Sequence, residues 1–138
     1  MENNLYYTPT IEEFHVGFIY ERKEYDDLRM IDEWYETSID TPWQLVDYVM
    51  YLQNFNFNKT RVKYLDQEGI ESLGWKDCDN IYNTIRWNFN DYILMFYKKD
   101  NRYLIFRDCG PNNIQTVFNG FIKNKSELIK LMQQLNIK

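Results

Sequence analysis

The one histidine of the chain, His15, stands beside two carboxylates, Glu12 and Glu13. Histidine is the side chain whose ordinary pKa lies closest to neutrality, so general acid–base catalysis would use it first. No serine or cysteine accompanies it in a recognised nucleophile motif. We therefore expect a structural histidine, hydrogen-bonded within a sheet, and no catalytic residue. A small hydrolase or nuclease-like enzyme that uses His15 and nearby carboxylates is the enzymatic alternative.

Metal and cofactor chemistry is poorly supported by the spacing of possible ligands. Cys78 and Cys109 lie too far apart in the sequence to form a zinc-binding motif with a single histidine. Asp77 and Asp79 flank Cys78, and their charge should raise the pKa of its thiol, which argues against a reactive thiolate. The glycine-rich loops that hold phosphates, GxGxxG and GxxxxGK[ST], are missing. We expect no metal and no cofactor.

An aromatic pair, Trp34 and Tyr35, stands among the acidic residues of the segment IDEWYE. An exposed aromatic pair in such a frame would suit a protein contact, whereas a strand that buries Trp34 is an equally good interpretation. We name Trp34 and Tyr35, together with Glu12, Glu13 and His15, as candidate interaction residues.

The overall charge is −5 and the sequence pI is about 4.9. Direct nucleic-acid binding is not expected, because it requires a basic face that displaces counterions from phosphates. No apolar run approaches the length that spans a bilayer, and the first residues lack the pattern of a signal peptide. We expect a soluble protein that no signal peptide exports.

The elements that would carry these residues follow from local patterns. Alternation predicts a strand over residues 14–20, with its apolar face formed by Phe14, Val16, Phe18 and Tyr20. A turn over residues 23–27 and a second strand over 30–37 should follow. Thr41-Pro42-Trp43-Gln44 begins a helix to about residue 53 with a capping box. Its apolar stripe is predicted to contain Leu45, Val46, Val49 and Leu52.

The second half of the chain should be richer in strands. We predict strands over residues 61–65, 80–89, 92–97, 103–106 and 114–122, a short helix capped by Asp66 and a last helix capped by Asn124. The fold class is therefore α+β, mainly an antiparallel sheet of about five to seven strands with two main helices packed on one face. We expect one domain over residues 1–138.

Three segments resemble a family of short proteins of crAss-like bacteriophages and related elements of Bacteroidetes. They are YTPTIEEFHVGF (7–18), KYLDQEGIESLGW (63–75) and FIKNKSELIKLMQQLNIK (121–138). The sequence departs from the family pattern at Ile19 and Gly69, where acidic residues are usual. The chain has no alanine and is rich in residues with A/T-rich codons, which fits such a genome. The resemblance implies phage origin and no particular catalytic residue.

These observations predict a non-enzymatic phage protein that acts by protein–protein contact, as a small component of the capsid or tail. Its partner would be a virion protein, a host protein or a second copy of the chain, with no membrane involved. It would lie in the host cytoplasm or in the assembled particle. The alternative is an early, host-directed factor that inhibits a defence or nucleic-acid enzyme through an acidic, aromatic surface.

Overall fold

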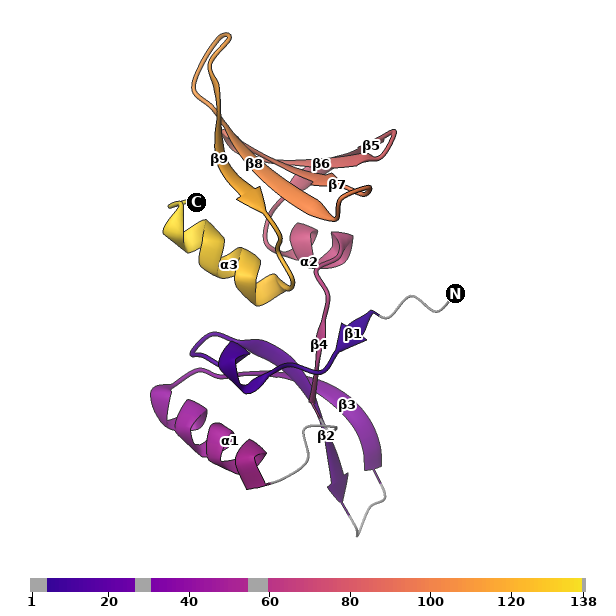
Figure 1. Ribbon diagram of the computed structural model, residues 1–138, viewed down its shortest axis with the longest axis vertical. Coiled ribbons are helices and arrows are strands. Elements are labelled where there is room, and N and C mark those ends of the chain that lie inside the picture. The colour runs from indigo at the N-terminus through magenta and orange to yellow at the C-terminus, as the bar shows by residue number, and fades with distance from the viewer. Residues whose placement is uncertain (1–4, 27–30, 55–59, 138) are drawn as a thin grey trace. The chain divides into compact units, whose positions relative to one another are not determined.

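The computed structural model describes residues 5–26, 31–54 and 60–137, without the side chains at 24–26, 31–33 and 51–54 (Figure 1). The chain divides into two compact units, residues 1–64 and 65–138, each with its own antiparallel sheet and core. The predicted α+β class with antiparallel strands is confirmed, and the strands are divided between sheets of four and five. That residues 1–138 form one domain stays a prediction.

The first unit is a four-stranded sheet with helix α1 on one face (Figure 1). Its order is β1-β4-β2-β3. The elements are β1 (Tyr6–Tyr7), the 3-10 turn η1 (Ile11–Glu13), β2 (Ile19–Asp26), β3 (Ile31–Ser38), α1 (Pro42–Asn54) and β4 (Thr60–Lys63). The buried core consists of Phe14, Phe18, Tyr20, Ile39, Tyr48 and Val62.

The first predicted strand begins later than expected. Residues 14–18 form a turn in which the Phe18 N–H donates to the His15 carbonyl at 3.0 Å, and Gly17 has a φ of 95°. Val16, predicted to face the core, is 46% exposed. The turn predicted over residues 23–27 is also wrong at residues 23–26, because these residues belong to β2, which ends at Asp26. Asp27 lies outside the described residues. Alternation of apolar residues did not distinguish a strand from this glycine-dependent turn.

The start of α1 is confirmed in its atomic detail. The Gln44 N–H donates to the Thr41 hydroxyl at 3.2 Å, and the Thr41 N–H donates to Gln44 Oε1 at 3.3 Å. This reciprocal pair is the capping box, and Pro42 occupies the first helical position, where a missing N–H costs nothing. The local sequence therefore fixes where α1 begins.

The second unit is a five-stranded meander, with α2 and α3 on the same side of the sheet (Figure 1). Its elements are α2 (Gln67–Ser72), β5 (Lys76–Ile81), β6 (Thr84–Phe89), β7 (Tyr92–Tyr97), β8 (Arg102–Asp108), β9 (Ile114–Gly120) and α3 (Lys125–Gln134). The buried core consists of Ile70, Trp75, Trp87, Leu94, Tyr103, Ile105, Ile122, Leu128 and Ile137.

One predicted strand of this unit, residues 80–89, is instead part of a hairpin. Ile81 pairs with Thr84 across a two-residue turn, in which Tyr82 has a φ of 55° and is 95% exposed. The turn is Tyr-Asn, which lacks the Asn-Gly or Asp-Gly signature of tight hairpins, so the sequence pattern did not reveal it. The hairpin of β7 and β8 and the caps of α2 and α3 are confirmed.

Candidate interaction site

Helix α1 uses one of its faces to complete the core of the first unit. Tyr48 is 9% exposed, and its ring centre lies 5.0 Å from that of Tyr20 and 5.5 Å from that of Phe14. Leu45 and Val49 pack against the same core. These contacts orient the helix about its own axis, and that orientation decides which of its other residues reach solvent.

The opposite face of α1 is also apolar and is exposed. Trp43, Val46 and Met50, which we call the outer stripe, are 79%, 50% and 58% exposed. Successive helical residues are about 100° apart, so these three lie within about 60° of one another, roughly opposite the buried face. Val46 was predicted to share one apolar stripe, here called the inner stripe, with Leu45, Val49 and Leu52, and it lies on the outer one. The side chain of Leu52 lies outside the described part of the chain. The spacing of three and four residues from Trp43 was present in the sequence and could have revealed this second stripe.

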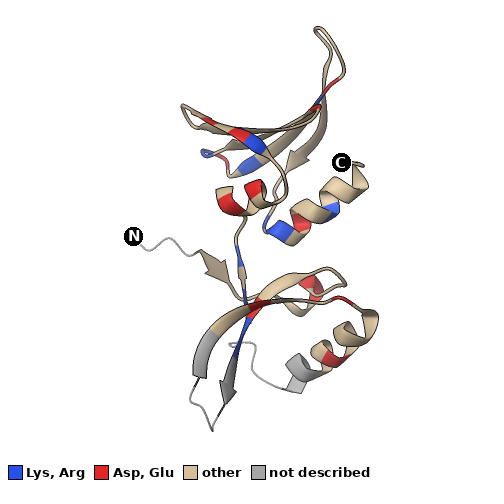
Figure 2. Ribbon diagram, turned by 180° about the vertical axis from the view of Figure 1, so that it is seen from behind, with Lys and Arg blue, Asp and Glu red and all other residues tan. Residues whose placement is uncertain are grey.

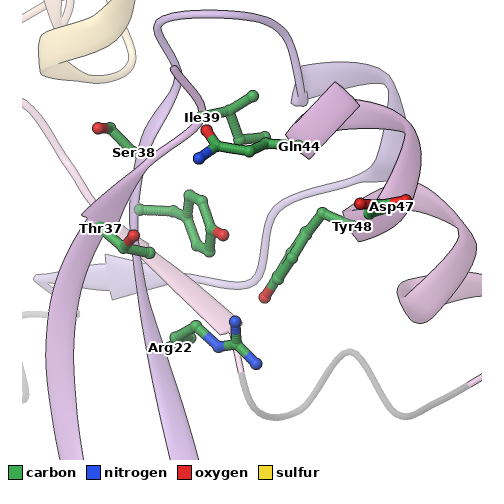
Figure 3. Close-up of a pocket in the computed structure, with 8 residues that line it drawn as sticks. Arg22, Thr37, Ser38, Ile39, Gln44, Asp47 and Tyr48 are labelled. Atoms are coloured by element: carbon green, nitrogen blue, oxygen red, sulfur yellow. The ribbon is translucent and has the colours of Figure 1, made fainter. Parts of the chain in front are cut away.

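A hollow of about 330 Å³ lies between α1 and the sheet of the first unit (Figure 3). Its walls come from β2, the end of β3 and the first turns of α1. The lining residues are Tyr20, Arg22, Thr37, Ser38, Ile39, Gln44, Asp47 and Tyr48. Figure 3 shows Arg22 at the hydroxyl end of the Tyr48 side chain and Asp47 near its other end. Most of the lining side chains are polar, so this site can offer hydrogen bonds as well as apolar contact.

Burial raises the pKa of the Tyr20 phenol above its ordinary value. The hydrogen bond with Tyr48 and the positive charge of Arg22 act in the opposite direction and are smaller. The phenol is therefore neutral at physiological pH and keeps its proton.

The side chains of His15 and Glu13, two of the predicted interaction residues, make hydrogen bonds within the segment before β2. His15 Nδ1 lies 2.7 Å from the carbonyl oxygen of Glu13, so it is the nitrogen that carries the proton in this contact. The Glu13 carboxylate accepts from the Tyr7 hydroxyl at 2.7 Å and from the Thr10 N–H at 2.7 Å. Glu12 is exposed. These bonds stabilise the segment before β2, and the imidazole meets the backbone of Glu13 rather than its carboxylate.

The two predicted aromatic residues, Trp34 and Tyr35, belong to different surfaces. They are adjacent in β3, so their side chains point to opposite faces of the sheet. Tyr35 pairs with Arg22, which lines the hollow beside α1, and is 39% exposed. Trp34 is half-buried on the other face, where Arg61 lies over its ring. A role for either residue in an interaction stays a prediction.

The second unit exposes a smaller apolar site at the end of β9. Phe121 is 65% exposed and borders a hollow of about 260 Å³. The other lining residues are Phe118, Ile122, Glu127, Lys130, Leu131 and Gln134. The guanidinium carbon of Arg102 lies 5.5 Å from the centre of the Phe121 ring. A single exposed ring beside a helix makes a weaker contact surface than the three large residues of the outer stripe.

The residues considered for chemistry do not converge in the described part of the chain. Within that part, no three His, Cys, Asp or Glu side chains are grouped so that they could hold a metal ion. Burial, followed by the charges of Glu71 and Asp79, raises the pKa of Cys78. The predicted direction is correct, but burial is the largest cause, and of the two acidic residues named in the prediction, Asp77 and Asp79, only Asp79 is among the causes. No described helix is long and apolar enough to cross a membrane.

Comparison with protein-family models, curated proteins and solved structures finds no match for this chain.

Proposed function

We propose that this chain is a non-enzymatic protein that acts by protein–protein contact through the outer stripe of α1. The observation that carries the proposal is the exposure of Trp43, Val46 and Met50 on the face opposite the buried one. The helix already completes its core with its inner face, so the outer stripe adds apolar surface that folding leaves in water. A partner that covers the stripe removes this surface from water, which is the main favourable term in association.

The geometry fits the docking of a helix into an apolar groove. Such helices present anchors at spacings of three, four and seven residues, and Trp43, Val46 and Met50 have this spacing. Tryptophan is among the residue types that most often dominate binding energy at protein interfaces. Trp43, as the largest and most exposed of the three, is the expected anchor.

The charge on α1 favours a partner other than a second copy of the chain. Asp47 is the one charged residue in the sequence of this helix, and Figure 2 colours acidic residues of the chain red. Helical geometry places Asp47 about 40° from Trp43 around the axis. If two α1 helices packed antiparallel about a two-fold axis centred on the stripe, Asp47 would face its own copy, and like charges there would oppose association. The partner we propose has an apolar groove with a lysine or arginine at its rim.

The origin of the protein is a second part of the proposal. The resemblance of three segments to proteins of crAss-like bacteriophages, and the richness in residues that have A/T-rich codons, support a phage protein, which we propose is a small component of the virion. Mass spectrometry of purified particles should then find the chain in stoichiometric amounts. Absence from the particles would contradict the virion role and leave the contact surface to be tested separately.

Photo-crosslinking tests the outer stripe directly. A photo-reactive amino acid at position 43 should give one main cross-linked product with another protein, in particles or infected cells. The matched control is the same amino acid at Tyr82, which is 95% exposed in the second unit and should give no such product. Val46→Glu should abolish the product while the inner face of α1 stays intact.

Three other outcomes of the cross-linking would each contradict one part of the proposal. A product with only a second copy of the chain would overturn the choice of a different partner. Equal products from positions 43 and 82 would overturn the stripe as the contact surface. A host enzyme in place of a virion protein would favour the host-directed alternative.

A further inference from the structure

We propose that the hollow between β2, β3 and α1 binds a small molecule with one oxyanion group, a carboxylate or a phosphate, attached to a compact apolar body. This site is separate from the outer stripe and does not depend on the function proposed above. Size, hydrogen-bonding capacity and charge each support it.

The size of the hollow suits a small organic molecule. Its volume of about 330 Å³ lies at the lower end of the range of ligand sites, roughly 300–1,000 Å³. A single water molecule accounts for about 30 Å³ of liquid volume, so the space exceeds what a bare inorganic ion needs. Ile39, which is 1% exposed, and the rings of Tyr20 and Tyr48 supply apolar walls for the rest of the ligand.

Gln44, Arg22 and the tyrosines bring hydrogen-bond donors to the hollow, whereas the Ser38 hydroxyl already donates to Asp40 Oδ1 at 2.7 Å. Gln44 Oε1 already accepts from the Asp40 N–H at 2.7 Å and the Thr41 N–H at 3.3 Å. The Gln44 side chain therefore meets a ligand with its amide nitrogen, which can only donate. Arg22 brings a guanidinium group, which has only donors. Tyr20 and Tyr48 hydrogen-bond to each other, and burial keeps the Tyr20 phenol protonated. A ligand group that only accepts hydrogen bonds, such as an oxyanion, complements this set.

The distribution of charge favours one negative group rather than several. The Arg22 guanidinium carbon lies 5.2 Å from the centre of the Tyr48 ring, a cation–π contact that orients it. A planar guanidinium binds carboxylate and phosphate oxygens through two parallel hydrogen bonds. Asp47, the acidic lining residue, lies near the other end of Tyr48 (Figure 3) and would repel a second anionic group. We therefore place the oxyanion beside Arg22 and the apolar body towards Ile39.

Four probes, three aromatic compounds of similar size and one inorganic ion, test the proposal on the full chain. Phenyl phosphate and phenylacetate carry the two possible anionic groups, benzyl alcohol carries the same ring without charge, and inorganic phosphate carries the head group alone. Binding is followed by NMR chemical shifts of the Arg22, Thr37 and Tyr48 signals. At least one aromatic anion should bind about tenfold or more tightly than benzyl alcohol, and the stronger of the two identifies phosphate or carboxylate.

Variants separate this site from non-specific binding. Arg22→Met should remove the preference for the anion, whereas Arg102→Met, in the second unit, should leave it unchanged. If Arg22→Met disrupts the unit, Tyr48→Phe keeps the ring and removes one hydroxyl, and it should weaken anion binding without loss of structure. Val46→Glu should have no effect, which distinguishes this site from the outer stripe.

Four results would overturn the proposal. They are equal binding of benzyl alcohol and the anions, unchanged anion binding by a folded Arg22→Met variant, chemical-shift changes that lie outside the hollow, and no binding of any probe at millimolar concentration. Binding of inorganic phosphate as tightly as phenyl phosphate would overturn the apolar part of the site.

Discussion

The guanidinium carbon of Arg61 lies 4.3 Å from the centre of the Trp34 ring. The same carbon lies 3.7 Å from the centre of the Tyr6 ring, and Arg61 Nη2 lies 3.1 Å from Glu21 Oε1. Through these contacts one side chain on β4 joins β1, β2 and β3 on the sheet face opposite α1. The sequence placed Trp34 among acidic residues, whereas in the fold a basic residue more than twenty positions away lies over its ring.

Replacement of Arg61 by methionine should destabilise the first unit. The change removes two cation–π contacts and an ion pair whose side chains are 27% and 19% exposed. Arg61 Nε is buried and has no hydrogen-bond partner among the described residues, so its removal also relieves a cost. We expect a net loss of about 1–2 kcal/mol. Hydrogen exchange of the β4 amides measures this loss within the first unit.

Arg86→Met is the matched control for Arg61→Met. Arg86 makes an ion pair of the same length, 3.1 Å to Asp79, but both side chains are about half exposed. Exposed pairs of this kind contribute about 0–1 kcal/mol. Equal losses from the two variants would show that the aromatic contacts of Arg61 contribute nothing.

Gly74 should not tolerate alanine. Its φ is 103°, and an added Cβ would lie 2.8 Å from Phe89 Cε2, inside the core of the second unit. Backbone strain and the ring clash together should cost about 2–4 kcal/mol. Gly110→Ala is the control, because its φ of 126° imposes strain while nothing lies within 4 Å of the new Cβ. Urea unfolding followed by Trp75 and Trp87 fluorescence compares the two, and equal losses would exclude a contribution from Phe89.

The parts of the fold that the sequence predicted correctly depend on short-range contacts. Thr41 and Gln44 cap α1, Asp66 accepts from the Gly69 N–H at 2.8 Å, and Asn124 accepts from the Glu127 N–H at 2.8 Å. Each of these bonds joins residues three positions apart. A capping pattern therefore contains the whole interaction and can be recognised without knowledge of the rest of the fold.

Two of the wrong predictions concern residues whose conformation depends on distant partners. The turn before β2 is held by the Gly17 N–H, which donates to the Ile39 carbonyl at 2.6 Å. Val46 was assigned to the inner stripe because helical periodicity groups apolar residues without showing where the sheet lies. Only the packing of Tyr48 against Tyr20 reveals which side of α1 is exposed. The outer stripe and the hollow both follow from that packing.

Asn124→Ala should destabilise the second unit by about 1–2 kcal/mol, because it leaves the N–H of Glu127 in the first turn of α3 without this acceptor. The site is 2% exposed, so water cannot easily replace the lost oxygen. Asn124→Asp and Asn124→Ser keep a capping oxygen and should recover most of the stability. Urea unfolding measures all three variants, and an Asn124→Ser variant as unstable as Asn124→Ala would contradict the capping role.

Stability of the second unit should fall as the pH rises from 10 to 12. Burial, with a smaller contribution from the negative charge of Asp66, raises the pKa of Tyr103 from its ordinary value near 10 to about 12. Over this interval the unfolded chain loses the Tyr103 proton before the folded chain does. The folded state thus binds more protons, and the free energy of unfolding decreases with pH. Below pH 10 this contribution is fully present.

Tyr103→Phe isolates this contribution from that of the other tyrosines. The variant should show a smaller decrease in the free energy of unfolding between pH 10 and 12 than the unmodified chain. Tyr82→Phe, at a position that is 95% exposed, is the matched variant that removes a tyrosine hydroxyl outside the core. Urea unfolding followed by Trp75 and Trp87 fluorescence gives the slope for each chain. Because Tyr103 is 6% exposed in the core of the second unit, an unchanged slope in Tyr103→Phe would mean that water reaches its hydroxyl in the folded unit.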